Sequence, residues 1–335
     1  MKNRPKGFLY RKTAYNYISY YKDGAWDEGI LRTDDTFTIS MMSASLHYGQ
    51  QCFEGLKAYM RKDGKINLFR VSDNAARFQE SCARLTMPTF PIERFLEAVK
   101  KVVLANREFI PDYGYGDTLY IRPFMIAVGA NINLKPSTEY IFSILVTPVG
   151  AYFDGPAKPV DLLVSEYDRA APYGTGHVKV GGNYGSSIYP QMKAKELGYA
   201  DCIFLDPKTH TKIEEVGAAN FFGITKDKKY ITPKSPSILD SITNRSLKWL
   251  ATHVLNLEVI ETDVYINDLS NISEAGACGT AAVISPIGTI TNKDHKHIFP
   301  HHNEMGPYSK QLYELLTGIQ FGDILDPNNW ITVLD

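Results

Sequence analysis

The stretch Gly176-His-Val-Lys-Val-Gly-Gly-Asn-Tyr-Gly-Ser-Ser187 decides how the rest of the chain is interpreted, because it sets one lysine against a run of glycines and a tyrosine. A lysine ammonium is ordinarily a hydrated surface charge, and it becomes a useful nucleophile only when it is desolvated or flanked by another cation. We expect Gly181, Gly182 and Gly185 to let the backbone turn sharply and approach a flat ligand. Lys179 is therefore interpreted as a reactive amine.

Tyr184 follows this lysine by five residues, and its phenol can donate a hydrogen bond to an anionic ring oxygen. A reactive lysine, a close backbone and such a donor together suit pyridoxal phosphate. The plain alternative is a solvated lysine before a glycine turn, since the chain has 36 lysines and arginines and most such residues are exposed.

Length and charge limit the classes of protein to consider. A chain of 335 residues is longer than one hydrophobic core usually serves, which predicts two domains. The 36 basic and 37 acidic side chains give a formal charge of −1, which argues against a protein that binds nucleic acid or membranes through bulk charge. Small molecules are the expected partners.

The cysteines carry information about compartment and metals. Cys52, Cys82, Cys202 and Cys278 are widely separated and show no CxxC spacing, so neither a disulfide framework nor a zinc site is predicted. The N-terminus leads into no apolar signal segment, and no apolar run approaches the roughly 18 residues of a membrane span. We expect a cytoplasmic protein with reduced thiols and no metal.

Both helical and extended patterns occur along the chain. The segment 148–159, with three prolines and two glycines, is the expected connection between a small domain, 1–147, and a large domain, 160–335. Apolar periodicity predicts helices at 72–85, 91–106 and 186–197, one that opens near 240 and one around 308–316. Strands are expected at 119–128, 140–146, 160–164 and 200–205.

Several charged residues lie where burial would be costly. Arg122 interrupts an apolar strand and needs either a protein carboxylate or a ligand carboxylate. Arg77 lies beside the apolar face of the helix 72–85, where it either reaches solvent or pairs with a buried anion. Of the adjacent Glu214 and Glu215, one should point inward.

Two segments could hold an anion, and one resembles a metal tract. The helix start at 241–243 offers unpaired N–H groups for a phosphate, and the small-residue turn 275–282 adds the Thr280 hydroxyl. The histidine-rich segment 293–302 has one carboxylate and no cysteine, so a solvated surface loop is expected there.

Six short motifs occur in an order that closely resembles the branched-chain amino-acid aminotransferases. They are Phe53-Glu-Gly, Tyr120-Ile-Arg-Pro, Gly150-Ala-Tyr, Lys179-Val-Gly-Gly-Asn-Tyr, Glu215-Val-Gly-Ala-Ala-Asn and Gly279-Thr-Ala-Ala. The resemblance spans nearly the whole chain. It implies a fold-type IV pyridoxal-phosphate enzyme with a small α/β domain, a larger pseudo-barrel domain and the cofactor between them in a homodimer. It also implies transamination of L-leucine, L-isoleucine and L-valine with 2-oxoglutarate to branched-chain 2-oxo acids and L-glutamate.

The resemblance assigns cofactor roles by matched position. Lys179 would form the aldimine with pyridoxal phosphate and shuttle the substrate proton, Glu215 would face the pyridine nitrogen, and Tyr184 would donate to the ring hydroxyl oxygen. Ala218 stands where some relatives carry threonine, which removes one possible hydroxyl. The implied phosphate seat consists of Arg77, Ile242, Thr243 and Thr280.

The same resemblance assigns the substrate side. Tyr120, Thr280 and the Ala281 N–H would receive the α-carboxylate. An apolar pocket for the side chain would be lined by Tyr48, Phe53 and Tyr152. Because this pocket must also take glutamate, Arg122 is expected to receive the second carboxylate. In related enzymes the loop around Leu134 reaches the partner subunit's site.

One departure and two rival functions remain. The phosphate helix is preceded by Leu239-Asp-Ser, where many relatives have Leu-Pro-Gly, so an acidic Asp240 would lie near the phosphate unless it turns away. A D-amino-acid aminotransferase or an aminodeoxychorismate lyase of the same fold is the nearest alternative. A non-enzymatic binding protein on the same scaffold is the other, and the Lys179, Tyr184 and Glu215 set argues against it.

Overall fold

The computed structural model describes residue 5 and residues 7–150 and 157–335. Its contacts divide the chain into two compact units. Unit 1 comprises Met1–Tyr152, Val178–Gly181 and Ile319–Asp335, and unit 2 comprises Phe153–His177 and Gly182–Gly318.

Unit 1 is built on a nine-stranded sheet with the order β18-β6-β5-β7-β8-β1-β2, with β3 paired to β1 and β4 paired to β7. Every recorded pairing in it is antiparallel. Its strands are β1 (Asn16–Lys22), β2 (Ala25–Trp26), β3 (Ile30–Arg32), β4 (Gln51–Phe53), β5 (Leu56–Met60), β6 (Ile66–Phe69), β7 (Thr118–Ala127), β8 (Tyr140–Val149) and β18 (Ile331–Leu334).

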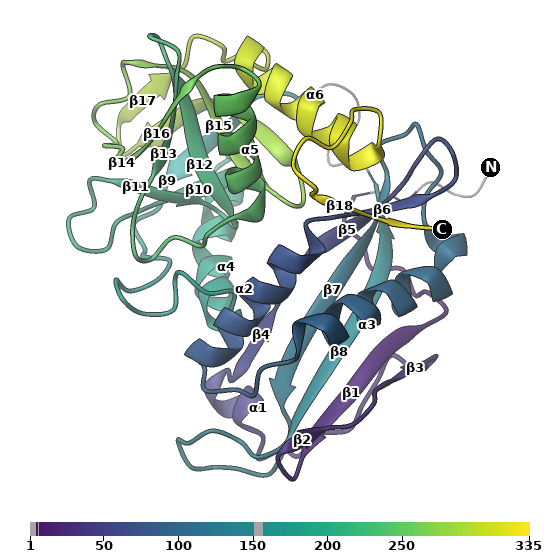
Figure 1. The fold of residues 1–335 in the computed structure, drawn as a ribbon. Helices are drawn as coiled ribbons and strands as arrows, with labels where there is room; N and C mark the ends of the chain where they lie inside the picture. The colour runs from purple at the N-terminus through teal and green to yellow at the C-terminus, as the bar shows by residue number, and fades with distance from the viewer. Residues whose placement is uncertain (1–4, 6, 151–156) are drawn as a thin grey trace. The chain divides into compact units, whose positions relative to one another are not determined.

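Two helices cover one face of this sheet, α2 (Val71–Arg84) and α3 (Ile92–Ala105), as Figure 1 shows. Their apolar stripes meet the sheet around Phe142, whose ring stacks on Phe90 with centroids 3.9 Å apart. Both helices lie near their predicted positions, but their starts differ from expectation. The helix α2 begins one residue before the expected range 72–85, with Arg70 in the left-handed conformation as its N-cap. The helix α3 begins one residue after the expected start at 91, with Pro91 as its N-cap.

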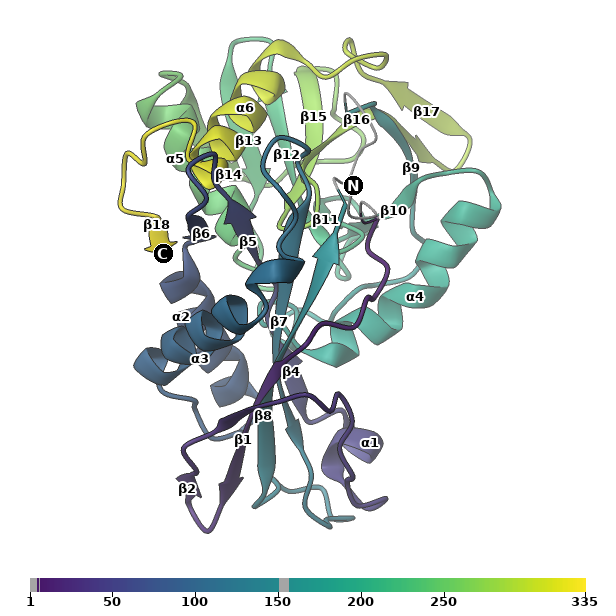
Figure 2. The same ribbon diagram turned by 90° about the vertical axis from the view of Figure 1, so that its right-hand side faces the viewer.

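Unit 2 is a second nine-stranded sheet that closes on itself. Six strands form a ring in the order β11-β10-β9-β16-β15-β12, because β12 pairs with β11 as well as with β15. The strands β13 and β14 extend the sheet beyond β12, and β17 pairs with β16 (Figure 2). The strands are β9 (Val160–Val164), β10 (Asp201–Leu205), β11 (Ile213–Val216), β12 (Ala219–Thr225), β13 (Lys229–Pro233), β14 (Glu258–Thr262), β15 (Ile272–Gly279), β16 (Val283–Asn292) and β17 (His295–Ile298).

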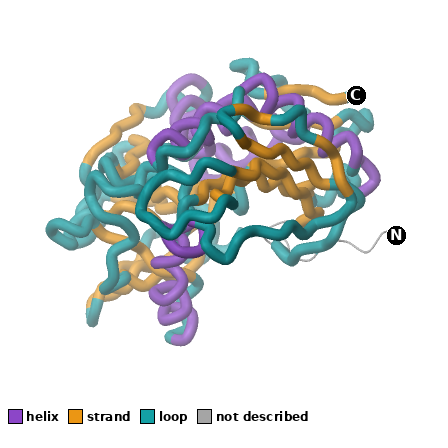
Figure 3. Tube along the Cα trace, turned by 90° about the horizontal axis from the view of Figure 1, so that it is seen from below, coloured by secondary structure: helices purple, strands orange, loops and turns teal. Residues whose placement is uncertain are grey.

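The expected mixed α/β class with a barrel-like sheet is therefore confirmed. The remaining helical segments are α1 (Ala44–Tyr48), the 3₁₀ turn η1 (Arg107–Phe109), α4 (Gly181–Glu196), α5 (Ile242–His253) and α6 (Pro307–Phe321). Figure 3 distinguishes the helices and strands from the loops that join them. No helix in the described part of the chain is both long and apolar enough to cross a membrane.

The glycine run after Lys179 is not a sharp turn, as the sequence suggested, but the first turn of α4. None of its three glycines has a positive φ. A Cβ on Gly181 would lie 2.8 Å from Gln51 Nε2, so a larger residue there would displace the end of the Gln51 side chain. A Cβ on Gly182 or Gly185 would meet no protein atom within 4 Å.

A single domain boundary at 148–159 was expected, but two segments beyond it also belong to unit 1. Val178 and Val180 are buried in the core of unit 1, which joins the Lys179 segment to that unit. The C-terminal strand β18 pairs with β6, so the last residues also belong to unit 1. Part of the proposed connection, 151–156, lies outside the described residues, and that boundary stays a prediction.

The histidine-rich segment, expected as a loop, instead forms β17, which pairs with β16 from Thr289↔Ile298 to Asn292↔His295. Most residues of β17 are exposed, so the strand lacks the alternation of apolar and polar residues by which a half-buried strand is predicted. Within the described residues no group of three or more histidine, cysteine or acidic side chains is arranged to hold a metal ion.

Candidate active site

Lys179 lies in a tight turn, in which the Val180 N–H donates to the Val178 carbonyl at 3.2 Å, and unit 1 holds this segment from both sides. Its carbonyl oxygen accepts from the Phe53 N–H at 3.1 Å, and its own N–H donates to Ser81 Oγ at 3.0 Å. The next residue, Val180, bridges to Cys52. The lysine side chain crosses the aromatic ring of Phe53, with Nζ 4.9 Å from the ring centroid. Its position is therefore fixed by backbone bonds to β4 and α2, which a long flexible side chain needs for directed chemistry.

Tyr120 and Arg122 project from the same face of β7, as residues two apart in a strand must. Arg122 Nη2 donates to Tyr120 Oη at 2.8 Å, and its guanidinium carbon lies 4.6 Å from the centroid of the Phe53 ring. Arg122 Nε is buried and has no hydrogen-bond partner among the described residues. Among the described residues no carboxylate forms an ion pair with Arg122.

Gly55 makes room for this pair. A Cβ at position 55 would lie 2.3 Å from Tyr120 Oη, a contact that side chains do not tolerate. The glycine of the Phe53-Glu-Gly motif therefore serves the placement of a phenol from another strand. This contact is a physical reason for a motif that had been identified only by its resemblance to a family.

Arg77 reaches a buried anion, and that anion is the protein carboxylate of Glu54. Arg77 Nε and Nη2 lie 2.7 and 2.9 Å from the two oxygens of Glu54, which also accepts from Asn74 Nδ2 at 2.7 Å. Burial by itself raises the pKa of Glu54, but the charge and hydrogen bonds of Arg77, the charge of Lys179 and the Asn74 bond together hold that pKa below its usual value. Sequence reasoning missed Glu54, although a carboxylate between a phenylalanine and a glycine was a visible signal.

The predicted side-chain pocket is described only in part. Tyr48 ends α1, is 44% exposed, and its hydroxyl donates to the carbonyl of Ile132. Tyr152 lies outside the described residues. Leu134 is 85% exposed in the loop between β7 and β8. Lys179, Phe53, Tyr120 and Arg122 are thus the predicted residues that unit 1 brings together.

Unit 2 carries the second group of predicted residues, with Glu215 at its centre. Glu215 Oε1 accepts from the Leu239 N–H at 2.8 Å and from Asn220 Nδ2 at 3.3 Å. Its other oxygen lies 3.1 Å from Arg169 Nε, a contact within ion-pair distance whose N–H geometry is not that of a hydrogen bond. A cation and two N–H donors favour the ionised carboxylate. Arg169 is a residue of this group that the sequence did not single out.

The start of α5 fits a phosphate. Ser241 is the N-cap, and its hydroxyl accepts from the Asn244 N–H at 3.2 Å. The N–H groups of Ile242 and Thr243, both in buried residues, donate to no acceptor within the described part of the chain. Two buried donors at a positive helix end form a ready seat for an anion. Asp240 turns away: its side chain is exposed, with Oδ2 3.5 Å from Arg245 Nε.

The other predicted cofactor residues lie in turns and at a helix start of unit 2. Thr280 and Ala281 form the half-buried turn between β15 and β16. Ala218 is exposed in the turn between β11 and β12, next to Gly217, whose φ is +53°. A Cβ on Gly217 would lie 2.3 Å from Asp201 Oδ2. Tyr184 is half-buried in the first turn of α4.

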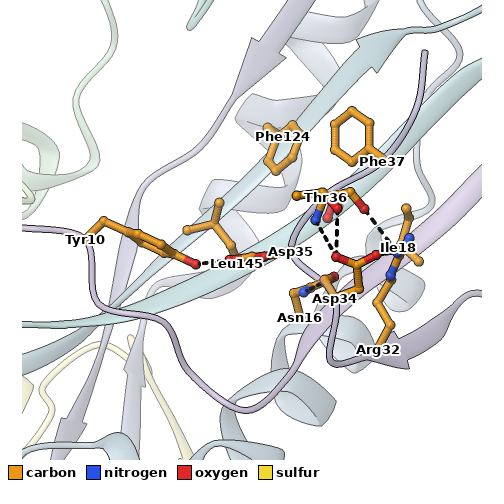
Figure 4. A pocket seen from close by; sticks show the side chains of 11 residues that line it. Tyr10, Asn16, Ile18, Arg32, Asp34, Asp35, Thr36, Phe37, Phe124 and Leu145 are labelled. Atoms are coloured by element: carbon orange, nitrogen blue, oxygen red, sulfur yellow. Dashed lines mark hydrogen bonds and ion pairs between the residues drawn. The ribbon is translucent and has the colours of Figure 1, made fainter.

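Another cavity of about 310 Å³ opens on the sheet of unit 1, and its lining includes Phe124, two residues beyond Arg122 on β7 (Figure 4). Its polar side chains satisfy one another: Arg32 pairs with Asp34 at 2.7 Å, and the Tyr10 hydroxyl donates to Asp35 at 2.7 Å. The rest of the wall is largely apolar, with Phe37 and Phe124 prominent. This cavity presents no unpaired group for chemistry.

Comparison with known proteins identifies the family of this chain. The family model of amino-transferase class IV matches residues 51–290. The branched-chain-amino-acid aminotransferase of Haemophilus influenzae is 57% identical over 334 residues, which cover 98% of this chain and 97% of the relative. The enzyme of the same name from Helicobacter pylori is 50% identical over 327 residues, 97% of this chain and 95% of the relative.

Solved structures agree as well. The branched-chain amino acid aminotransferase of Escherichia coli superposes with a TM-score of 0.79 at 26% identity, covering 96% of this chain and 99% of that one. The enzyme of Thermobaculum terrenum, solved in its PLP-bound holo form, gives a TM-score of 0.81 at 26% identity over 96% of this chain and 98% of that one.

These matches show that the chain belongs to the class IV aminotransferases. Within that class it is one of the branched-chain-amino-acid aminotransferases, pyridoxal-phosphate-dependent transferases that act on amino acids and oxo acids. The resemblance drawn from the six motifs is confirmed.

Proposed function

We propose that this enzyme transaminates L-leucine, L-isoleucine and L-valine with 2-oxoglutarate, and that Lys179 is the amine to which the cofactor is attached. The observation that carries the proposal is the pair of cations on one ring: Lys179 Nζ and the Arg122 guanidinium lie 4.9 and 4.6 Å from the centroid of Phe53. A reacting amine, an apolar wall and a carboxylate receptor are thus collected in unit 1.

Bound pyridoxal phosphate supplies a carbonyl carbon that reacts with amino groups and a ring that accepts the electron pair left by the departing α-proton. Lys179 moves that proton between the substrate Cα and the cofactor. Glu215 holds a proton at the ring nitrogen, and the Arg169 cation supports its charge from the other side. Tyr184 donates to the ring hydroxyl oxygen.

The phosphate is held by the Ile242 and Thr243 N–H groups, with Thr280 and Arg77 as further contacts. The two unpartnered N–H groups at the start of α5 support this assignment, because a buried donor without an acceptor is costly unless a ligand satisfies it. Arg77 contributes charge from its pair with Glu54. Ala218 lies beside the cofactor without a hydroxyl to offer.

On the substrate side, Tyr120, Thr280 and the Ala281 N–H receive the α-carboxylate, and Phe53, Tyr48 and Tyr152 line the side-chain pocket. The aliphatic substrates pack on the aromatic rings. With 2-oxoglutarate the distal carboxylate binds Arg122. This role is supported by the guanidinium's lack of an ion pair, and of a hydrogen-bond partner for Nε, among the described residues.

We also propose that the enzyme is a homodimer in which the loop around Leu134 enters the partner's pocket. Large apolar side chains are exposed just before α1, on α1 and on this loop: Met41 is 84% exposed, Leu46 61% and Leu134 85%. Exposed apolar groups in such number mark an association surface. The bond from Tyr48 to Ile132 ties a pocket residue directly to the loop.

The test is a set of single-turnover half-reactions read from the cofactor's absorption. L-leucine, L-isoleucine, L-valine and L-glutamate are expected to convert the cofactor fully and to release the matching 2-oxo acid, identified by mass spectrometry. D-leucine is expected to react at a negligible rate. A preference for D-amino acids would overturn the substrate assignment in favour of a D-amino-acid aminotransferase.

A further inference from the structure

A second cavity, of about 320 Å³, lies wholly within unit 2. It is bounded by the segment after β10, by the start of β11 and by the loop that follows β13. Its apolar wall consists of Pro172, Pro207, Ile213, Pro233 and Pro236. A volume near 300 Å³ is at the lower end of small-molecule sites.

Glu214 lines this cavity and is only 3% exposed. Its Oε1 accepts hydrogen bonds from Ser235 Oγ and Ser237 Oγ, both at 2.5 Å. Its Oε2 accepts no hydrogen bond from any described residue, and it is not sealed from solvent. A buried carboxylate needs a cation or further donors, and within the described chain Glu214 has no cation within ion-pair distance.

Two ammonium groups of the same cavity are also unpaired. Lys208 and Lys234 are exposed and form no ion pair with the described residues. The other charged groups of the cavity are already engaged. Lys212 pairs with Asp263 at 2.8 Å.

Asp206 is likewise engaged by the turn that follows it. Burial tends to raise the pKa of Asp206, but the N–H groups of Lys212, Thr211 and Thr209 and the Thr209 hydroxyl outweigh burial and lower that pKa to about 2. The groups left for a ligand are therefore one carboxylate oxygen in the wall and two ammonium groups at the rim.

We propose that this cavity is a second binding site, distinct from the site at Lys179, for the zwitterion of an aliphatic α-amino acid. The ligand's ammonium group donates to Glu214 Oε2, and its carboxylate binds Lys208 and Lys234. The four prolines and Ile213 enclose the aliphatic side chain. A simple cation would satisfy Glu214 alone, and a simple anion would satisfy only the lysines, whereas a zwitterion satisfies both.

The site is connected to Glu215 by a short chain of contacts within unit 2. Ser237, which donates to Glu214, also offers its carbonyl oxygen to Arg169 Nη2. Arg169 Nε in turn lies 3.1 Å from Glu215 Oε2. A ligand that draws Glu214 toward the cavity shifts Ser237 and hence Arg169.

The binding claim is tested on the holoenzyme after borohydride reduction, so that no turnover consumes the probe. A Tyr173→Trp substitution places a fluorophore in the cavity wall, where Tyr173 is 84% exposed. Titration with L-leucine is expected to change this fluorescence saturably. 4-Methylpentanoate, which lacks the ammonium group, and isopentylamine, which lacks the carboxylate, are expected to bind about 10-fold more weakly or worse.

Matched variants separate this cavity from every other site. Glu214→Gln and the rim variant Lys208→Ala/Lys234→Ala are each expected to weaken L-leucine binding by about 10-fold. Lys229→Ala, which removes a lysine already paired with Asp227 and Glu258, is expected to leave it unchanged. The rim variant serves as a second test because its lysines are exposed and their removal does not disturb the core.

The proposal would be overturned if no saturable L-leucine signal appeared up to about 50 mM. A dissociation constant above that concentration would be too weak for a metabolite site. Equal binding by the parent and both variants would overturn it as well. A response to potassium ions but not to L-leucine would instead assign Glu214 to a monovalent cation. These outcomes do not depend on the substrate assignment, since an enzyme of different specificity would still show or lack this signal.

Discussion

Arg122 Nη2 donates a 2.8 Å hydrogen bond to Tyr120 Oη, two residues earlier on the same strand, and the Arg122 guanidinium lies over the rings of both Phe53 and Tyr120. The phenol and the guanidinium are therefore held as a unit. In the proposed function, Tyr120 serves the α-carboxylate common to all substrates, and Arg122 serves only the substrates with a second carboxylate.

Replacing Arg122 by methionine should consequently separate the two half-reactions. The kcat/KM for glutamate and 2-oxoglutarate is expected to fall by roughly 10²-fold or more, the scale of a lost charge-assisted bond of about 3 kcal/mol. The leucine half-reaction should change far less. Single-turnover rates for each substrate measure the difference, and equal losses would assign Arg122 to structure or to the α-carboxylate. Arg32→Met, at an arginine already paired with Asp34, is the matched control.

Glu215 and Glu214 are adjacent and equally buried, yet their contacts predict different roles. Glu215→Gln is expected to lower kcat by about 10²-fold while KM for leucine changes little, because a carboxamide cannot hold the ring nitrogen's proton by charge. Glu214→Gln should lower kcat much less, since that side chain bonds to Ser235 and Ser237. Stopped-flow and steady-state rates for both variants make the comparison. A larger kcat loss in Glu214→Gln would show that the wrong carboxylate has been assigned.

The pair Arg77 and Glu54 is predicted to control acid stability. Glu54 is fully enclosed, so Glu54→Gln leaves the Arg77 charge without its partner and is expected to cost about 3–5 kcal/mol of unfolding free energy at pH 7. The folded-state pKa of Glu54 lies below its ordinary value of 4.5. The stabilisation is therefore complete above that value and is lost as pH falls through the lowered pKa.

Urea unfolding of wild type and Glu54→Gln between about pH 3 and 7 measures this contribution. The difference in unfolding free energy should be constant near neutral pH and shrink below about pH 4.5. Asp63→Asn, which breaks the exposed pair with Arg61, should change stability little at any pH. A constant difference across the whole range would contradict the role given to ionised Glu54.

Gly55 provides a steric test of the Tyr120 position. In Gly55→Ala the new Cβ would lie 2.3 Å from Tyr120 Oη, so the phenol must move, at an expected cost of about 1–3 kcal/mol and with a raised KM for every amino-acid substrate. Adding Tyr120→Phe removes the clashing oxygen. The double variant should recover part of the lost stability, a non-additive result expected for residues in contact. Additive losses in thermal unfolding would show that the two positions do not meet.

Much of this arrangement was predictable because it is written in local patterns. The strands that carry Arg122 and the helices around Phe78 and Phe95 follow apolar periodicity, and the structure places them within a few residues of the expected bounds. Arg122 was recognised because it interrupts this apolar pattern, and a charge in a buried strand needs a partner.

The residues that were missed are joined by long-range contacts that no local pattern encodes. Glu54 and Arg77 meet across 23 positions of the chain, and Arg169 reaches Glu215 from a loop. The start of α4 was misjudged for a different reason. Each glycine disfavours a helix by about 1 kcal/mol, but tertiary bonds override this: Asn183 Nδ2 donates to the Thr175 carbonyl at 2.7 Å, and Thr175 Oγ1 donates back to Asn183 Oδ1 at 2.7 Å.

The identity of the reacting amine is the central claim, and peptide mapping after borohydride reduction of the holoenzyme tests it most directly. The account predicts that the visible absorption band disappears and that the pyridoxyl mass is found on the peptide that contains Lys179. In Lys179→Ala, the protein should stay folded and still bind the cofactor without a covalent link, while turnover falls by at least the 10²–10⁴-fold typical of a lost general base. A pyridoxyl group on any other lysine, or near-normal turnover in Lys179→Ala, would contradict the account.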